Sequence, residues 1–567
     1  MRTKRAKWQL YPPVPEAHLA SFPDLAPILV QCLYNRGLTS PDEVRLFLAG
    51  EYEEADPFRL KGMAEAVTRI RRAIRGDELM AVYGDFDADG ITGTVVLAET
   101  LSSLGGRIIP YIPHRLDEGY GLHEDAIDKL ANRGVSLILT VDCGARALRE
   151  VRHARSLGLD TIITDHHSPL DELPPAVAVI DTKRADCSYP FKALSGVGIA
   201  FKLAQALLLA NQEVPLPVAH SPADEEQLLD LVALGTVADL SPLLGENRSL
   251  VKRGLVQLNH PRRLGISALM EQARVKPESV TSTTISYVLG PRLNAAGRID
   301  RAMLSYELLS TSSPSRAQEL AKLLEEKNHE RRELMLASLE KARLQITDQE
   351  DEPLLFVTGE DYPGGVIGLV AHRLCEEFYR PAVVVEIGDK ESVASARSIE
   401  EFHITAALDE CASLLKKHGG HARAAGFRVS NENLPILEQE LREMASEQLA
   451  ELELLPTLRI DADIPISNLR PETFSISGQL EPLGAANPQP LFLSARVEVR
   501  ESRIVGDDHL KLSLSDGRAV WDGIAFGMGQ QAESVTSHID IVYTPQIRTW
   551  NYEEQLQLKI EDFKPSR

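Results

Sequence analysis

Three short apolar runs in the first half of the chain have the length and composition of buried β-strands. They are Met80–Tyr83, Leu137–Val141 and Thr161–Thr164. From about residue 70 to 220, such runs alternate with stretches whose apolar residues recur at helical spacing. Because strands that alternate with helices are typical of βαβ units, this part of the chain predicts an α/β fold around a parallel sheet.

Helical patterns dominate the flanking segments. Residues 1 to about 65 have a polar, helical pattern, and the run Leu228–Leu240 is apolar enough for a buried helix. Residues 300–347 form a long helical stretch with Glu and Arg at helical spacing, as expected of a helix that connects domains. A coiled coil is the alternative for this stretch, but the apolar heptads are too irregular to favour it.

A second α/β unit and a β-rich region complete the pattern. The unit runs from about 353 to 447, begins with the strand Leu354–Val357 and contains a Gly-rich turn, Pro363–Gly368, before a helix. About five short strands in the next hundred or so residues predict a small β-barrel of the OB type. These alternating runs are 458–462, 496–500, 511–514, 539–543 and 555–560.

Length and charge narrow the classes of function. A chain of 567 residues with 43% hydrophobic residues is long enough for packed cores in roughly three or four domains. The formal net charge of −22 argues against a protein that coats nucleic acid by bulk attraction. A nucleic-acid enzyme with a local basic groove is still compatible with that charge.

The cysteines and the N-terminal residues indicate in which cellular compartment the protein is expected. The five cysteines are scattered without a CxxC pair, so neither a disulfide framework nor a zinc knuckle is expected. The basic start Met1–Arg5 is followed by residues 6–13 without an apolar core, which argues against a signal peptide. No segment approaches the roughly 18 apolar residues of a membrane span. We expect a soluble, cytoplasmic protein with reduced thiols.

Acidic or imidazole side chains follow the ends of apolar runs in five segments. In an open α/β sheet, ligands bind at the carboxyl ends of the strands, so these side chains should meet in one crevice. Carboxylates a few ångströms apart take up protons or a cation, because their charges repel. Oxygen and imidazole donors without a thiolate cluster suit Mg²⁺ or Mn²⁺, which predicts a two-metal phosphoryl hydrolase. The segments are 85–90, 141–144, 165–167, 181–182 and 238–239.

Each of these motifs alone has a plainer interpretation. Asp85, Asp87 and Asp89 alternate, so an extended strand would place them on one face. Gly90 and the residues after it favour instead a turn into a helix that starts near Thr94, whose N-terminus attracts anions. A lone acidic loop more often caps a helix in solvent, and a lone histidine pair more often packs or faces water. The repeated order of strand, acid or histidine, and turn is what favours metal binding.

Three motifs resemble the DHH phosphoesterase superfamily, namely Asp87–Gly90, Val141–Gly144 and Asp165–His167. Further motifs are similar to its RecJ branch and extend the resemblance over nearly the whole chain from about residue 70. In the last of them, Ala485 and Ala486 depart from the usual Gly-rich version. These motifs lie at 112–115, 118–122, 234–239, 290–298, 365–368, 395–397, 419–426 and 482–488.

Pattern and resemblance together divide the chain into five parts. Residues 1–65 are expected to be an N-terminal helical segment and 66–300 a DHH phosphoesterase domain with a parallel sheet. Residues 301–350 are the connecting helix, 351–450 a smaller α/β DHH-associated domain, and 451–567 an OB-fold nucleic-acid-binding domain.

The resemblance also implies the ligands of two divalent cations, Mn²⁺ or Mg²⁺. Asp85 and His167 are expected beside these ligands or as alternates to them. Tyr83 stands where some relatives have a metal-binding histidine, so no ligand is assigned there. Asp142 is the expected bridge, because a carboxylate offers two oxygens, and Asp181 is assigned to a nearby loop. The implied metal ligands are Asp87, Asp89, Asp142, His166 and Asp239.

A second set of residues supplies cations and hydrogen-bond donors suited to phosphate oxygens. For any one arginine, a surface salt bridge is the plainer interpretation. Because RecJ-like enzymes hold a 5′ end of single-stranded DNA with such residues, Arg292, Ser395 and Arg397 are the expected 5′-phosphate contacts. The whole set is Arg292, Asn294, Arg298, Ser395 and Arg397.

Glycines, a histidine and aromatic residues in the last third of the chain add candidates. Gly419 and Gly420 would let the backbone approach the nucleotide closely, and His421 would bind the scissile phosphate or act as a general acid. A Gly-rich turn with a packed histidine is the structural alternative. In the OB-like region, candidate base-stacking side chains have core packing as an equal alternative; they are Tyr543, Trp550 and Tyr552.

The resemblance implies a monomeric, metal-dependent exonuclease that degrades single-stranded DNA from the 5′ end to 5′-mononucleotides in DNA repair and recombination. It implies a single-strand-binding protein and a RecQ-type helicase as partners, and no membrane. One alternative is a small-substrate DHH phosphodiesterase for oligoribonucleotides or cyclic dinucleotides, against which the extra C-terminal domain argues. Another is an inactive DHH-derived replication scaffold, against which the retained metal carboxylates argue.

Overall fold

The computed structural model describes residues 6–52, 54–115, 118–217, 223–349, 352–506, 508–550 and 553–566. Its contacts divide the chain into two compact units. The parallel-sheet unit comprises Ala49–Glu333 and Glu481–Pro488. The barrel unit comprises Met1–Leu48, Leu334–Leu480 and Gln489–Arg567.

Five parallel strands form the centre of the parallel-sheet unit, in the order β3-β2-β4-β5-β6. The three strands expected from the apolar runs are confirmed as β2 (Leu79–Gly84), β4 (Val135–Val141) and β5 (Asp160–Thr164). Two further strands, β3 (Arg107–Tyr111) and β6 (Ala178–Ile180), complete the sheet.

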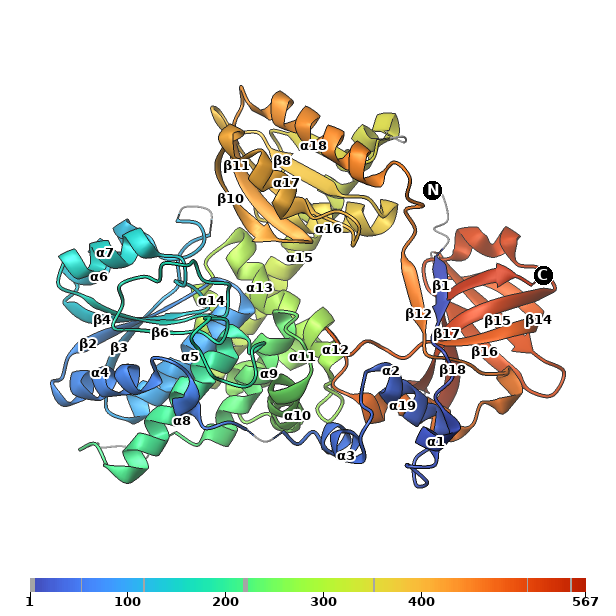
Figure 1. Ribbon diagram of the computed structural model, residues 1–567, viewed down its shortest axis with the longest axis horizontal. Coiled ribbons are helices and arrows are strands. Elements are labelled where there is room, and N and C mark those ends of the chain that lie inside the picture. Colours follow the sequence, from blue (N-terminus) through green and yellow to red (C-terminus); the bar gives the residue numbers. More distant parts are fainter. Residues whose placement is uncertain are drawn as a thin grey trace. The chain divides into compact units, whose positions relative to one another are not determined.

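Helices cover both faces of this sheet (Figure 1). Met80 and Val82 of β2 belong to one hydrophobic core, whereas Ala81 and Tyr83 belong to a second core on the other face of the sheet. Successive side chains of a strand point to opposite faces, so a strand that is apolar throughout must be buried on both. The first core includes α4 (Met63–Arg75), α5 (Ala88–Ser103) and α8 (Gly196–Glu213), and the second includes α6 (Glu124–Asn132) and α7 (Leu148–Ser156).

A helical region follows the sheet in the same unit. The expected buried helix is confirmed as α9 (Leu229–Ala238), and Asp239 is its C-terminal capping residue. The long helix expected over 300–347 is interrupted, because α14 ends at Ser310 and α15 (Pro314–Ile346) begins at a proline, which suits a first helical turn. The other helices are α10 (Gly245–Asn259), α11 (Leu264–Gln272), α12 (Ser282–Thr284), a π-helical turn (Ile285–Leu289), α13 (Gly290–Ile299) and α14 (Met303–Ser310).

The barrel unit contains a second five-stranded sheet, in the order β10-β11-β9-β8-β7. Only β7 and β8 are parallel in it, and β10 forms one edge. The strands are β7 (Leu355–Gly359), β8 (Ala382–Glu386), β9 (Glu391–Arg397), β10 (Leu415–His421) and β11 (Ala424–Ser430). The helices are α16 (Ile367–Phe378), α17 (Ile404–Glu410) and α18 (Leu434–Leu449). This confirms the second α/β unit.

The expected β-barrel is also confirmed, with one strand changed. β14 pairs with β15 and also with β17, which closes the sheet. The run 458–462 was expected in the barrel, but its first part is β12 (Thr457–Ile460), which pairs with β1 (Lys7–Leu10) instead. Only the end of the run joins the barrel sheet, where the short strand β13 (Ala462–Asp463) runs parallel to β14. The barrel takes its remaining strand from Val520–Ala525, where a weak apolar alternation hid it. Its strands are β14 (Phe492–Val505), β15 (His509–Ser515), β16 (Val520–Ala525), β17 (His538–Trp550) and β18 (Glu553–Pro565).

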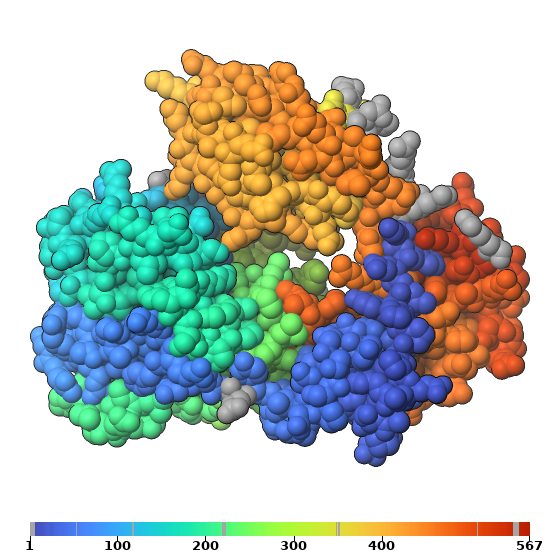
Figure 2. Space-filling model, viewed as in Figure 1, coloured from blue at the N-terminus to red at the C-terminus, as the bar shows by residue number. Residues whose placement is uncertain are grey.

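The N-terminal residues join the C-terminal ones within the barrel unit. β1 runs parallel to β12, and Figure 2 shows the blue N-terminal residues against the orange residues near the C-terminus. The helices of this segment are α1 (Glu16–Leu19), α2 (Pro27–Asn35) and α3 (Pro41–Ala49), and the strand β1 before them was not expected. No helix among the described residues is long and apolar enough to cross a membrane.

Candidate metal centre and substrate-binding residues

The acidic loop after β2 turns directly into a helix. Asp87 caps α5, because its Oδ1 accepts hydrogen bonds from the amides of Asp89 (2.9 Å) and Gly90 (3.1 Å). The helix therefore begins at Ala88, six residues before the expected start near Thr94, so that expectation is wrong. Asp89 lies in the first helical turn, so the three acids of this loop do not share the face of an extended strand.

The helix α13 holds this acidic loop in place. The side-chain Oδ1 of Asn294 accepts a 2.7 Å hydrogen bond from the amide of Ala88. A Cβ atom on Gly297 would lie only 2.5 Å from the carbonyl oxygen of Phe86, so a glycine is needed there. Asn294 was expected to bind substrate, and the structure gives it a contact with the loop that carries Asp87 and Asp89.

The N-terminus of α8 binds Asp89. The two oxygens of this fully buried carboxylate accept hydrogen bonds of 2.7 Å from the amides of Gly196 and Val197. Orphan amides at a helix N-terminus suit an anion. A Cβ atom on Gly196 would lie 2.8 Å from Oδ1 of Asp142, so only glycine permits this approach. The sequence interpretation missed this support, although the capping residue Ser195 before the glycines was the available signal.

Asp165 of the histidine motif orients its neighbours. Its Oδ1 accepts hydrogen bonds from the amide of His166 (2.7 Å) and from Nδ1 of His167 (2.8 Å), and its Oδ2 accepts one from the amide of Ala145 (2.8 Å). Burial favours a higher pKa for Asp165, but the bonds and charge of His167 hold that pKa below its ordinary value. Such a carboxylate–histidine pair fixes the ring of a metal ligand. The sequence interpretation gave Asp165 no role.

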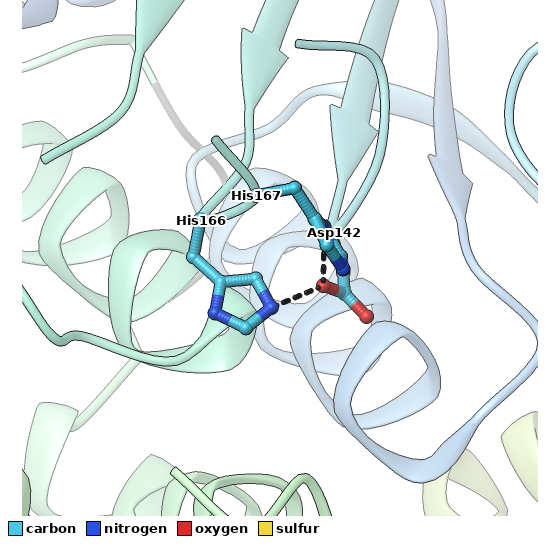
Figure 3. A group of neighbouring side chains, drawn as sticks. All are labelled: Asp142, His166 and His167. Carbon is cyan, nitrogen blue, oxygen red and sulfur yellow. Dashed lines mark ion pairs between the residues drawn. The ribbon is translucent and has the colours of Figure 1, made fainter. Parts of the chain in front are cut away.

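Asp142 lies between the two histidines (Figure 3). Its Oδ1 is 3.1 Å from Nε2 of His166 and 3.8 Å from Nδ1 of His167. Asp142 has a φ of 61°, in the left-handed region that residues other than glycine rarely adopt and that is often strained at functional sites. Tyr120 contacts the same group, because its hydroxyl lies 3.2 Å from Nδ1 of His167 and donates to the Asp142 carbonyl oxygen at 3.3 Å.

The structure brings the carboxylates and histidines expected as metal ligands into three overlapping groups. In each group the candidate ligand atoms lie within 4.8 Å of one another. Asp142 and His166 each belong to two of the groups. The groups are Asp142, His166 and His167; Asp89, His166 and Asp239; and Asp85, Asp87 and Asp142.

The buried carboxylates of this cluster repel one another, which favours the binding of a cation. Burial raises the pKa of Asp85, Asp89 and Asp142, and the neighbouring carboxylates raise it further. Burial and Asp87 raise the pKa of Asp239 to about 7. Among the described residues, the buried Oδ1 of Asp85 accepts no hydrogen bond. Carboxylate and imidazole donors fit Mn²⁺ or Mg²⁺, and a divalent cation would remove the repulsion that these pKa values report.

Tyr83 has no place among these ligands. It is fully buried, its hydroxyl donates a 2.9 Å hydrogen bond to the carbonyl oxygen of Gly121, and its ring stacks on Tyr111. Asp181 is also fully buried, and its Oδ1 accepts a hydrogen bond from the amide of Lys183.

The residues expected to bind phosphate lie in both units. In the parallel-sheet unit, Arg292 of α13 forms a two-pronged ion pair with Glu325 of α15, at 2.5 and 3.1 Å, and also donates to the carbonyl oxygen of Val288. Arg298 lies in the last turn of α13. The alternative of salt bridging thus applies to Arg292 in this structure, and a phosphate would compete with Glu325 for it.

In the barrel unit, Ser395 and Arg397 share one face of β9. Arg397 donates to the hydroxyl of Ser395 (3.2 Å) and to the carbonyl oxygen of Ala396 (2.8 Å). Gly368 at the start of α16 approaches them, because a Cβ atom there would lie 3.0 Å from the Ser395 hydroxyl. Ser395 and Arg397 therefore lie beside the N-terminus of α16.

The Gly-rich segment before His421 is the edge strand β10, not a turn. A Cβ atom on Gly420 would lie 2.2 Å from the carbonyl oxygen of Ala424, so the strand pairing requires glycine, whereas Gly419 faces open space. His421 is exposed at the end of the strand rather than packed. The structural alternative of a Gly-rich turn with a packed histidine is therefore wrong.

The suggested stacking role of Tyr543 is wrong as well. Tyr543 is fully buried in the barrel, where its ring contacts Phe492 and its hydroxyl accepts a hydrogen bond from Ser494. The side chain of Trp550 and the whole of Tyr552 lie outside the described residues.

Three family models match successive parts of the chain. The DHH family, N-terminal domain, matches residues 80–236, the DHHA1 domain matches 351–451, and the RecJ OB domain matches 460–562. The matches follow the order of the parallel sheet, the second sheet and the barrel.

Several known proteins are similar to this chain over nearly its full length. The single-stranded-DNA-specific exonuclease RecJ of Bacillus subtilis is 36% identical over 99% of this chain and 71% of its own length. The protein of the same name from Escherichia coli is 33% identical over 96% of both chains. The crystal structure of Thermus thermophilus RecJ in complex with Mn²⁺ superposes with a TM-score of 0.85 at 28% identity, covering 100% of this chain and 80% of that one. A complex of the same protein with Mg²⁺ gives a TM-score of 0.79 at 26% identity, covering 99% of this chain and 79% of that one.

Proposed function

This chain belongs to the RecJ family of DHH phosphoesterases, and we propose on that basis that it is a metal-dependent exonuclease of single-stranded DNA acting in DNA repair and recombination. The observation that carries the proposal is the buried cluster at the carboxyl ends of β2, β4 and β5. An inactive scaffold would have no reason to keep so many buried carboxylates, because their repulsion destabilises the fold without a cation.

Two divalent cations at this cluster would supply an activated water and neutralise charge on the scissile phosphate. We propose Asp87, Asp89, Asp142, His166 and Asp239 as their ligands, with Asp142 as the bridge. The amides of α8 hold Asp89 in one orientation, and Asp165 holds His167. A site whose ligands are fixed before substrate binds loses little free energy to reorganisation during the reaction.

We further propose that hydrolysis starts at the 5′ end and releases 5′-mononucleotides. Arg292, Ser395 and Arg397 would bind the terminal phosphate, with Arg298 as a further cation on α13. Asn294, which was expected to bind substrate, would act instead through the loop that carries Asp87 and Asp89. Gly419 and Gly420 leave room for the sugar–phosphate backbone, and the exposed His421 can donate a hydrogen bond to the scissile phosphate or a proton to the leaving oxygen. These roles rest on the family and on the chemistry of the side chains.

The barrel and the protein's partners extend this function beyond the metal site. The barrel would lengthen the contact with single-stranded DNA, as OB folds do. We propose that the protein is a cytoplasmic monomer, and that a single-strand-binding protein and a RecQ-type helicase supply its substrate.

Digestion of end-labelled DNA tests this function. With Mn²⁺ or Mg²⁺, a long single strand labelled at the 5′ end should release labelled mononucleotide at once, whereas duplex DNA and EDTA-treated reactions should not. Asp142→Ala should abolish hydrolysis and leave DNA binding measurable, and Asp125→Ala at an exposed position of α6 is the matched control. Turnover by Asp142→Ala, or preference for a dinucleotide over the long strand, would contradict the proposal.

A further inference from the structure

The octapeptide Glu481–Pro488 belongs to the parallel-sheet unit, although it joins two elements of the barrel unit. It lies in the chain between α19 (Pro471–Leu480) and β14, yet its contacts place it with Ala49–Glu333. The metal-site chemistry above assigns no role to this segment.

Two buried polar side chains hold the octapeptide. Arg248 of α10, which is 2% exposed, donates to the carbonyl oxygens of Glu481 (2.8 Å) and Pro482 (3.3 Å). The fully buried hydroxyl of Ser282 lies 2.8 Å from Oε2 of Glu481 and 2.6 Å from the carbonyl oxygen of Leu483. Leaving buried polar groups without partners is costly, so Arg248 and Ser282 bind the octapeptide specifically and hold it in one position.

The octapeptide in turn contacts the loop that follows Asp239. The amide of Leu243 donates a 2.8 Å hydrogen bond to the carbonyl oxygen of Ala485. Gly484 lies against the same residue, since a Cβ atom on it would be 2.8 Å from Cδ1 of Leu243. The octapeptide thus fixes the backbone four residues after a proposed metal ligand.

This loop decides where the Asp239 carboxylate points. Asp239 caps α9 and is followed by Leu240 with a φ of 61°, so the helix does not continue to restrain it. Ser241 donates a 2.6 Å hydrogen bond to Oδ2 of Asp239, and its amide bonds to the carbonyl oxygen of Thr236. The position of Ser241 is limited on one side by α9 and on the other by Leu243.

We propose that Glu481–Pro488 is a positioning element of the metal site, which holds the 239–243 loop so that Asp239 faces His166 and Asp89. The inference rests on the proposed metal-dependent function. Supports behind metal ligands typically contribute 10- to 100-fold to metal affinity. A substitution in the octapeptide should therefore alter metal binding, although the octapeptide contacts neither the metal nor DNA.

Mn²⁺ titration of the full-length protein without DNA, followed by the electron paramagnetic resonance of free Mn²⁺, tests this role. Ser282→Ala removes the hydroxyl under the octapeptide, and Gly484→Ala pushes Leu243. Each should weaken one of two Mn²⁺ sites by about 10- to 100-fold and leave the other site and DNA binding in EDTA unchanged. Gly478→Ala in α19 is the matched control, because a Cβ atom there meets nothing within 4 Å.

A double-mutant cycle separates positioning from general damage. In an Asp239→Asn background, Ser282→Ala should cost no further Mn²⁺ affinity. An equal loss in that background, or wild-type Mn²⁺ binding by Gly484→Ala, would overturn the positioning role. Gly484→Ala decides the matter if Ser282→Ala fails to fold. Absence of Mn²⁺ binding by the wild-type protein would instead overturn the proposed function, so the two failures are distinct.

Discussion

The side chain of Asn294 accepts a 2.7 Å hydrogen bond from the backbone amide of Ala88. Ala88 is the first residue of α5, and it separates Asp87 from Asp89. A residue of the helical region therefore anchors the acidic loop of the sheet, some two hundred positions away in the sequence.

Asn294→Ala should consequently weaken metal binding more than DNA binding. The Ala88 amide loses its partner, the loop gains freedom, and Mn²⁺ affinity should fall about 10- to 100-fold, as measured by isothermal titration. Asn259→Ala is a matched control, because Asn259 also accepts a hydrogen bond from a backbone amide, that of Val280 at 2.8 Å. A loss of DNA affinity in EDTA with unchanged Mn²⁺ affinity would show instead that Asn294 acts on the substrate.

Gly196→Ala should disrupt the site while the fold persists. The new Cβ would lie within 2.7–2.9 Å of the Asp142 side chain, so Asp142 or the N-terminus of α8 must move. Exonuclease activity should fall at least about 100-fold, since misplacing a catalytic group by about 1 Å has effects of that size. Gly76→Ala in the same unit meets only ordinary contacts of 3.4 Å or more and should retain activity. Activity within a factor of two of wild type in Gly196→Ala would show that Asp142 tolerates displacement.

Metal removal should destabilise the parallel-sheet unit. Mn²⁺ at 100 times its dissociation constant would stabilise the folded state by about 2.7 kcal/mol, so EDTA should lower the thermal midpoint followed by calorimetry. Burial and the neighbouring Asp87 oppose ionisation of Asp85 in the folded protein and raise its pKa. Asp85→Asn removes this unfavourable carboxyl group, and should therefore raise the midpoint of the metal-free protein and reduce the shift that Mn²⁺ causes. A metal-free midpoint below that of the wild type would contradict this account of the cluster.

Trp8→Phe should loosen the N-terminal segment from the barrel. The indole nitrogen donates a 2.7 Å hydrogen bond to Oδ2 of the buried Asp562, and the ammonium of Lys564 lies 4.0 Å from the ring centre. Phenylalanine keeps a ring for the ammonium but leaves the carboxylate without this donor, at a cost of about 1–3 kcal/mol. Limited proteolysis should then cut earlier within residues 6–48, with nuclease activity on short strands retained. Wild-type cleavage rates would mean that β1 pairing alone holds the segment.

Local sequence pattern accounts for much of the candidate site. Strand, acid and turn recur in short stretches, and the carboxyl ends of parallel strands meet at one edge, so Asp85, Asp142 and His166 could be expected together. The same locality explains the error at α5, where Asp87 caps a helix that already includes Gly90 and the residues after it, which had suggested a turn before Thr94.

The order of the sheet, the second sheet and the barrel follows from the sequence alone, as do the chemical types that line the site. What holds those residues in place depends on tertiary contacts: Asn294 on Ala88, α8 on Asp89, and the octapeptide Glu481–Pro488 beside the Asp239 loop. Such contacts also pair β12 with β1 and place Tyr543 inside the barrel. Periodicity reports which face of an element is buried, but not which distant element covers it, because that choice depends on packing between segments far apart in the chain.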